Sequence, residues 1–169
     1  MSEKFHVAVE RVLGHEGGYS NRSLADDPGG ETNWGVTIGT ARANGYHGDM
    51  KTMNRNEAIV IYKRAFWDRN RLGDMPFPVA FQVFDGAVNH GAGNAVKWLQ
   101  KAVGTTQDGA IGPLTLAAVN NADPFAVIMK FNAARLDFYT HLSNWNANSK
   151  GWTRRVAGNL LYAQQDLRS

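Results

Sequence analysis

The chain has 169 residues, 43% of them hydrophobic, so it is long enough to bury a compact core, and disorder is not expected. It carries 18 lysines and arginines against 15 acids, a net charge of +3. The basic residues form no dense run and no stripe interleaved with aromatics, so we do not expect a nucleic-acid partner. The absence of cysteine excludes disulfides, thiol nucleophiles and thiolate metal sites.

Membrane insertion is also not expected. No segment approaches the roughly 20 apolar residues that a membrane-spanning helix needs, and the first residues have scattered charges without the apolar run of a signal peptide. We therefore expect a protein that is made soluble in the cytoplasm. A substrate outside the membrane would require another component to let the protein through.

The first predicted helix begins after Ser2, which can cap it, and ends near Gly14. Its apolar residues recur at helical spacing, at Phe5, Ala8, Val9, Val12 and Leu13. Four residues beyond Val12, the same row reaches Glu16, just before two glycines. A core-facing row is an unusual place for a glutamate.

The remaining chain predicts a mainly α fold of the α+β type. Residues 19–36 lose the helical period and are rich in turn residues, which indicates a long loop or a small β-hairpin. Further helices are expected near residues 54–66, 77–88 and 95–103. The longest helix should begin at Asp123-Pro124 and reach Leu142. A polar linker at 144–151 should follow, and then a last helix from about Trp152.

A glycine-rich break near residue 90 indicates a division of the chain. We expect a region 1–90 and a region 91–169 that pack into the same globular unit. Neither internal repeats nor low-complexity tracts are found.

Two nearby carboxylic acids have the residue types that glycoside hydrolysis needs, one to protonate the leaving oxygen and one to activate water or attack the sugar. Glu16, at the end of an apolar row, should be partly desolvated, which raises the pKa of a general acid. Asp27, in a solvated turn, should remain ionised. Other interpretations stay open, because Glu16 could instead cap a turn or pair with an arginine, and Asp26 and Asp27 fit ordinary turn chemistry.

Several sequence blocks, in order, resemble the glycoside hydrolase 108 family, whose members are N-acetylmuramidases common among phage endolysins. The blocks are residues 15–21 (HEGGYSN), 27–37 (DPGGETNWGVT), 84–91 (FDGAVNHG) and 99–104 (LQKAVG). The similarity extends from about Val9 to about Asp166. It implies that residues 1–90 form the catalytic region and that residues 91–169 resemble a peptidoglycan-binding region.

The resemblance implies a lysozyme-like fold and hydrolysis of the β-1,4 bond between N-acetylmuramic acid and N-acetylglucosamine in peptidoglycan. Glu16 would be the catalytic acid and no cofactor would be required. A further similarity to phage-type lysozymes implies that Asp27 and Thr32 position a water for an inverting reaction. The stretch 22–26 is longer than in that pattern, so the choice between Asp26 and Asp27 stays open.

An endolysin of this kind would be a monomer that reaches the periplasm with the help of a holin-type partner and acts there on the cell wall. Two other functions stay open. A lytic transglycosylase uses one glutamate but yields an anhydromuramoyl product, and a noncatalytic wall-binding or virion protein would keep the fold without the chemistry.

Candidate substrate contacts are aromatic and amide side chains near helix ends or in loops, of which we select Tyr19, Asn89 and His90 from a set that also includes Trp34, Tyr46 and Trp152. The five histidines show no His-Glu-x-x-His spacing, so no metal site is expected. The segment Asp108–Thr115 resembles the turn of small peptidoglycan-binding modules. We favour a connecting turn between helices for it, because its dipeptides are common in turns.

Overall fold

The computed structural model describes residues 2–14, 18–21 and 30–168. The chain forms two compact units, a first unit of residues 1–69 and a second unit of residues 70–169. The fold is mainly α with a small antiparallel sheet after the first helix, which confirms the predicted fold class. The division at residue 90 stays a prediction. None of the helices in the described residues is long and apolar enough to span a membrane.

The first unit begins with the predicted helix α1 (Glu3–Leu13). The Ser2 side chain accepts a hydrogen bond from the backbone N–H of Phe5, as expected of an N-cap. The apolar face of α1 is buried, and Phe5 packs edge to face against Trp67. The other elements of this unit are β1 (Thr32–Asn33), β2 (Val36–Thr37), α2 (Ile38–Ala43), η1 (Met50–Thr52), α3 (Arg55–Tyr62) and the π-helical turn η2 (Lys63–Asp68).

The sheet is a hairpin whose strands are joined by Trp34 and Gly35. Thr32 pairs with Thr37 and Asn33 with Val36, so the loop has two residues. Both loop residues have a positive φ, 51° at Trp34 and 72° at Gly35, as a type I′ turn requires. Glycine adopts this conformation freely, whereas a tryptophan is held in it only when its surroundings fix it.

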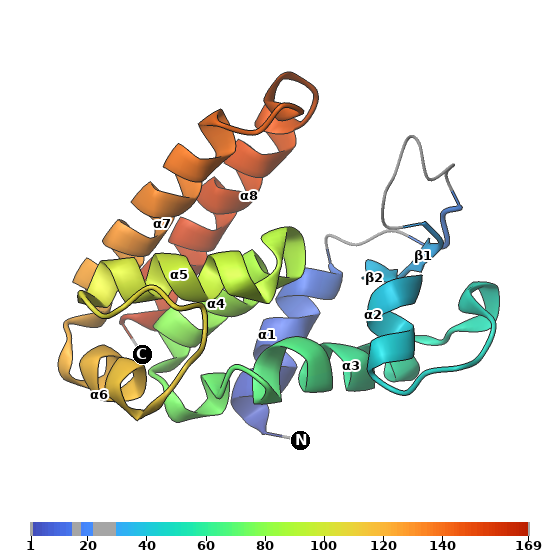
Figure 1. Cartoon of the computed structure of the whole chain (residues 1–169), viewed down its shortest axis with the longest axis horizontal. Coiled ribbons are helices and arrows are strands. Elements are labelled where there is room, and N and C mark those ends of the chain that lie inside the picture. Colours follow the sequence, from blue (N-terminus) through green and yellow to red (C-terminus); the bar gives the residue numbers. More distant parts are fainter. Residues whose placement is uncertain (1, 15–17, 22–29, 169) are drawn as a thin grey trace. The chain divides into compact units, whose positions relative to one another are not determined.

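The second unit is helical. Helix α5 (Ala92–Val103) packs on α4 (Phe77–His90) and α7 (Pro124–Thr140), and α8 (Trp145–Asp166) packs on α4 and α7. Figure 1 shows α7 and α8 running side by side as an antiparallel pair. The unit is completed by η3 (Leu72–Asp74) and α6 (Pro113–Asn121), which follows α5 and packs against it.

The end of the chain differs from the prediction. The expected linker at 144–151 is wrong, because α8 already begins at Trp145; with 22 residues α8 is longer than α7, which has 17. Polar side chains in this first part bond back to the helix, as Asn148 Nδ2 does to the carbonyl of Asn144. Trp145 packs against Trp152, so a contact two helical turns away stabilises a segment whose composition is typical of a loop.

Candidate active site

The predicted catalytic pair lies outside the described residues. Glu16 lies in the segment 15–17, and Asp26 and Asp27 lie in the segment 22–29. The structure does describe the segments that flank them, residues 18–21 and the chain from Gly30 onward. The local geometry of the candidate site is therefore built from these flanks.

The two flanks are joined by backbone hydrogen bonds. The N–H of Ser20 donates to the carbonyl of Thr32 and the N–H of Thr32 donates to the carbonyl of Ser20, both at 2.8 Å. The Thr32 hydroxyl donates to the carbonyl of Gly30 at 3.2 Å. Donation uses the hydroxyl hydrogen and leaves the oxygen lone pairs as acceptors. Thr32 is thus held in a fixed place at the end of the segment that contains Asp27.

Tyr19 and Glu31 form a second link between the flanks. The Tyr19 hydroxyl donates to Glu31 Oε1 at 2.7 Å, and Lys51 Nζ lies 5.6 Å from the centre of the Tyr19 ring. The hydrogen bond to Glu31, together with desolvation, raises the pKa of the Tyr19 phenol. Tyr19 therefore stays protonated and able to donate over the physiological range. Nothing in the sequence marks Glu31 beyond its place in the loop.

The hairpin turn is fixed by three side chains that donate hydrogen bonds to backbone carbonyls. Asn33 is buried and its Nδ2 donates to the carbonyl of Met50 at 2.7 Å. Trp34 Nε1 donates to the carbonyl of Met53 at 2.9 Å, and the Tyr62 hydroxyl donates to the carbonyl of Trp34 at 2.9 Å. These bonds account for the positive φ of Trp34, because they hold both its ring and its backbone.

The other two predicted contact residues lie at the end of α4 in the second unit. Asn89 Nδ2 donates to the backbone carbonyl of Asp85 at 2.6 Å. The half-buried ring of His90 lies among aromatic rings, with centroid distances of 4.6 Å to Tyr139 and 5.3 Å to Trp152. Desolvation, with the nearby charge of Arg135, lowers the pKa of His90 to about 4. His90 is therefore neutral near pH 7. The substrate roles of both residues stay predictions.

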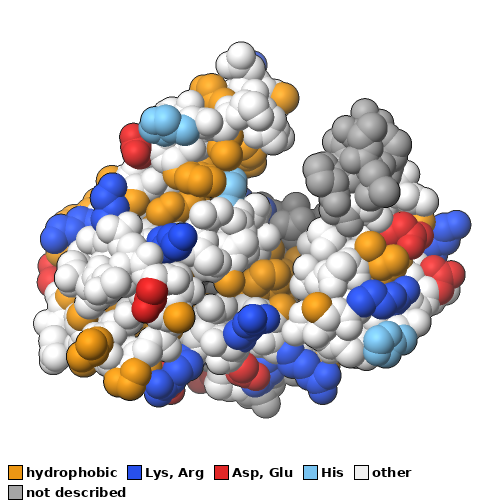
Figure 2. All heavy atoms as spheres, in the orientation of Figure 1, with side chains coloured by type: hydrophobic (Ala, Val, Ile, Leu, Met, Phe, Trp, Pro, Cys, Tyr) orange, Lys and Arg blue, Asp and Glu red, His pale blue; other side chains and the backbone are white. Residues whose placement is uncertain are grey.

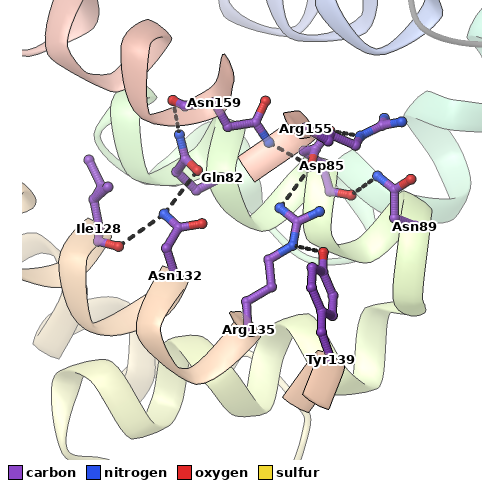
Figure 3. Close-up of polar contacts among 9 residues, drawn as sticks. All are labelled: Gln82, Asp85, Asn89, Ile128, Asn132, Arg135, Tyr139, Arg155 and Asn159. Atoms are coloured by element: carbon purple, nitrogen blue, oxygen red, sulfur yellow. Dashed lines mark hydrogen bonds and ion pairs between the residues drawn. The ribbon is translucent and has the colours of Figure 1, made fainter. Parts of the chain in front are cut away.

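A buried ionic cluster, which was not predicted from the sequence, lies around Asp85 in the second half of α4. Figure 3 shows Arg135 of α7 and Arg155 of α8 converging on Asp85 of α4. Arg135 Nη1 lies 2.8 Å from Asp85 Oδ2, and Arg155 Nε donates to Asp85 Oδ1 at 2.7 Å. Asn159 Nδ2 also donates to Asp85 Oδ2 at 2.7 Å. One carboxylate thus connects three helices.

The electrostatics of the cluster favour the ionised carboxylate. Burial alone would raise the pKa of Asp85, but the charges of Arg135 and Arg155 outweigh burial and hold that pKa below its ordinary value. Arg135 also donates from Nε to the Tyr139 hydroxyl, while its Nη2 has no hydrogen-bond partner in the part of the chain that the structure describes.

A signal for this cluster exists in the sequence. Asp85 interrupts an apolar stripe on α4, and Arg135 stands beside the buried row of α7. Charged residues at such positions are almost always paired. The pattern points to buried charges, but three helices far apart in sequence contribute them, so spacing alone does not name the partners.

Within residues 2–14, 18–21 and 30–168, no group of three or more histidine, aspartate or glutamate side chains is placed to hold a metal ion. The described part of the candidate site contains hydroxyl, amide and carboxylate groups on the hairpin and on the flanking residues Tyr19 and Glu31. Such groups bind and orient a polar substrate or a water molecule.

Comparison with known proteins identifies the family. The model of the Glycosyl hydrolase 108 family matches residues 9–91. The solved structure of SagA from Brucella abortus is 35% identical in sequence, with a TM-score of 0.88 over 98% of this chain and 96% of that chain. The chain belongs to the glycosyl hydrolase 108 family. It is therefore a glycoside hydrolase with a lysozyme-like fold.

A second model, that of a Predicted Peptidoglycan domain, matches residues 94–157 of this glycosyl hydrolase 108 member. No match was found among the curated proteins. The two models together support a lysozyme-like function on peptidoglycan. All six predicted site residues lie within the glycosyl hydrolase match, and the segment Asp108–Thr115 lies within the peptidoglycan match.

Proposed function

We propose that this glycosyl hydrolase hydrolyses the β-1,4 bond between N-acetylmuramic acid and N-acetylglucosamine in peptidoglycan, with Glu16 as the general acid. The observation that carries the proposal is that the family match covers the Glu16-Gly17-Gly18-Tyr19 block of the sequence. Ser20, which follows this block in the sequence, pairs with Thr32 of a hairpin that is fixed by buried hydrogen bonds. A fixed scaffold is what a catalytic group needs, because small displacements of reacting groups lower the rate strongly.

The proposed reaction divides the chemistry between two carboxyl groups. Glu16 protonates the glycosidic oxygen as the bond to the sugar breaks. Asp27 takes a proton from a water that attacks the opposite face of the sugar, which inverts the anomeric configuration. Thr32, whose hydroxyl hydrogen is bonded to Gly30, accepts a hydrogen bond from that water and orients it.

The first experiment replaces Glu16 by glutamine, which keeps the shape of the side chain but removes its acidic proton. We expect hydrolysis of purified peptidoglycan to fall by about 10²–10⁴-fold, the usual contribution of a general acid. Binding to the wall and the thermal midpoint of unfolding should stay close to those of the wild type. The matched control is Glu3→Gln, which alters an exposed glutamate in the first turn of α1. Undiminished hydrolysis by Glu16→Gln would exclude this assignment.

A second pair of variants decides which aspartate activates the water. Asp27→Asn should lower kcat with little change in KM, since the role of Asp27 is in the transition state. Asp26→Asn should leave kcat near the wild-type value. The opposite result would assign the role to Asp26, and full activity of both variants would remove the second carboxylate from the mechanism.

We also propose that the enzyme serves in host cell lysis. It would be a monomer that is made in the host cytoplasm and reaches the periplasm with a holin-type partner. The resemblance to phage endolysins supports this role. Expression in a Gram-negative host should cause lysis when a holin is present together with the enzyme, and sedimentation should give the mass of one chain. Lysis in the absence of a holin would contradict the proposed need for this partner.

A further inference from the structure

Lys51, in η1 of the first unit, is a basic residue beside the hairpin that the proposed reaction does not use. Its Nζ lies 5.6 Å from the centre of the Tyr19 ring, within the range of a cation–π contact. The residue is exposed, and its Nζ forms no ion pair with any carboxylate of residues 2–14, 18–21 and 30–168. Figure 2 shows charged side chains of both signs at the surface of the first unit beside β1. The ammonium group of Lys51 is therefore open to a ligand.

The backbone that carries Lys51 is fixed to the hairpin. The buried amide of Asn33 donates to the carbonyl of Met50 at 2.7 Å and, more weakly, to the carbonyl of Lys51 at 3.5 Å. Asp49 Oδ1 accepts from the backbone N–H of Lys51 at 2.9 Å and caps this turn. Because Asn33 adjoins Thr32, the backbone of Lys51 is tied to the strand that carries the residue proposed to orient the water.

The tyrosine ring beside the ammonium group is also fixed. The Tyr19 hydroxyl donates to Glu31 Oε1 at 2.7 Å. A phenol that donates to a carboxylate has a more electron-rich ring, which strengthens the attraction of the ring for a cation. A lysine loses rotamer freedom when a ligand fixes it, and a side chain that already lies against a ring loses less. Lys51 is thus partly ordered for binding before any ligand arrives.

The chemistry of the glycan limits what an ammonium group can select. Both sugars are N-acetylated, and they differ in one substituent, the lactyl ether on O3 of muramic acid. The carboxyl group of this ether is either free or joined to a peptide that itself bears carboxylates. An ammonium binds a carboxylate through charge-assisted hydrogen bonds, which are stronger than its bonds to neutral hydroxyl and acetamido groups. A lysine beside the candidate site would therefore favour a muramoyl unit over N-acetylglucosamine.

We propose that Lys51 is a specificity-determining residue whose ammonium group binds a carboxylate on the lactyl substituent of N-acetylmuramic acid, while the Tyr19 ring supports the lysine side chain. The inference rests on the proposed function, because it takes the muramoyl glycan as the substrate. The carboxylate belongs to the lactyl group in strands without peptides, and to the peptide where one is attached. Lys51 would thereby let the enzyme distinguish peptidoglycan from a neutral polymer of N-acetylglucosamine.

The test is a titration of the full-length, isotope-labelled chain, followed by NMR. The ligand is the disaccharide of N-acetylglucosamine linked to N-acetylmuramic acid, which lacks the bond proposed for cleavage. Three forms are compared: the free lactyl carboxylate, its neutral methylamide, and the form that carries alanyl-isoglutamate. We expect saturable shift changes at Tyr19 and Lys51. At least one charged form should bind about tenfold or more tightly than the methylamide, and its identity assigns the carboxylate.

Three variants sharpen this test. Lys51→Gln removes the charge and should bind the charged forms and the methylamide with equal affinity. Lys51→Arg keeps the charge and should retain the preference for a carboxylate. Lys63→Gln, the control, removes the same charge from the first unit at an exposed site where Lys63 pairs with Asp68, and should leave the preference unchanged.

The inference is overturned if neither charged form binds more tightly than the methylamide, or if Lys51→Gln keeps the preference of the wild type. Failure of the proposed function is a separate result, because the titration requires no catalysis. The wild-type enzyme would then prefer the charged disaccharide, yet release no fragments that end in a reducible N-acetylmuramic acid from peptidoglycan.

Discussion

The hairpin of the first unit and the ionic cluster of the second unit both fix side chains in place, but by different means. The hairpin is held by neutral donors, Asn33, Trp34 and Tyr62, each of which donates to backbone carbonyls. The cluster is held by full charges around a single carboxylate, Asp85. Loss of a neutral bond removes one contact to a backbone carbonyl, whereas loss of the carboxylate leaves the buried cation Arg135 without its counter-charge. The hairpin should therefore tolerate single changes that the cluster does not.

The largest effect is expected from Asp85→Asn. The variant keeps the size of the side chain but leaves the fully buried Arg135 without its counter-charge and removes the ion pair with Arg155, so the free energy of unfolding should fall by about 3–5 kcal/mol. Urea denaturation of the variant measures this loss. The control is Asp74→Asn, which breaks an exposed pair with Arg71 and should cost no more than about 1 kcal/mol. Equal losses in the two variants would contradict the comparison.

A smaller effect is expected from Asn33→Ala. The change removes the 2.7 Å hydrogen bond to the buried carbonyl of Met50, which keeps only the longer bond, 3.4 Å, from the N–H of Met53, so the loss should be about 0.5–1.5 kcal/mol. Because Asn33 adjoins Thr32, hydrolysis of peptidoglycan should also slow. Hydrolysis measured at a temperature where the variant is fully folded separates this positioning effect from the loss of stability. Asn56→Ala, at an exposed site on α3, should change neither quantity. A stable variant with full activity would show that the hairpin anchor is not needed for catalysis.

The smallest effect at neutral pH is expected from His90→Phe, which keeps an aromatic ring among the rings that surround it. Because the folded-state pKa of His90 is about 4, below its ordinary value of 6.5, the unfolded chain binds more protons between these two values. The free energy of unfolding of the wild type should thus decrease as the pH falls from 6.5 to 4. The lowered pKa of Asp85 acts only at still lower pH.

In His90→Phe the decrease between pH 6.5 and 4 should be smaller than in the wild type, as thermal midpoints measured across this range would show. His141→Gln is the control, since His141 is exposed at the end of α7. An unchanged pH dependence in His90→Phe would mean that folding does not lower the pKa of His90.

The contrast between the two regions also explains what the sequence could predict. Helix α1 and the hairpin depend on local signals, namely an apolar period with a serine cap and a glycine-rich loop, and both were predicted. The anchors of the hairpin were not, because Asn33 bonds a carbonyl 17 positions away and no local pattern marks that partner.

The cluster around Asp85 was missed for the same reason. Its arginines lie 50 and 70 positions away along the chain, on helices whose packing a single sequence does not specify. The start of α8 at Trp145 was also missed, since a polar segment looks like a linker until the packing of Trp145 on Trp152 is known. Of the site itself, the roles of Glu16, Asp27, Thr32, Tyr19, Asn89 and His90 stay predictions.

The most direct test of the central claim is the chemistry of the product. Purified Gram-negative peptidoglycan is digested with the wild-type enzyme, and the soluble fragments are identified by mass spectrometry before and after reduction with borohydride. We predict fragments that end in a reducible N-acetylmuramic acid, which requires that water attacks the sugar. Fragments that end in anhydromuramic acid would contradict hydrolysis, because they form by internal attack of the muramoyl hydroxyl, and would make the enzyme a lytic transglycosylase that needs no activated water.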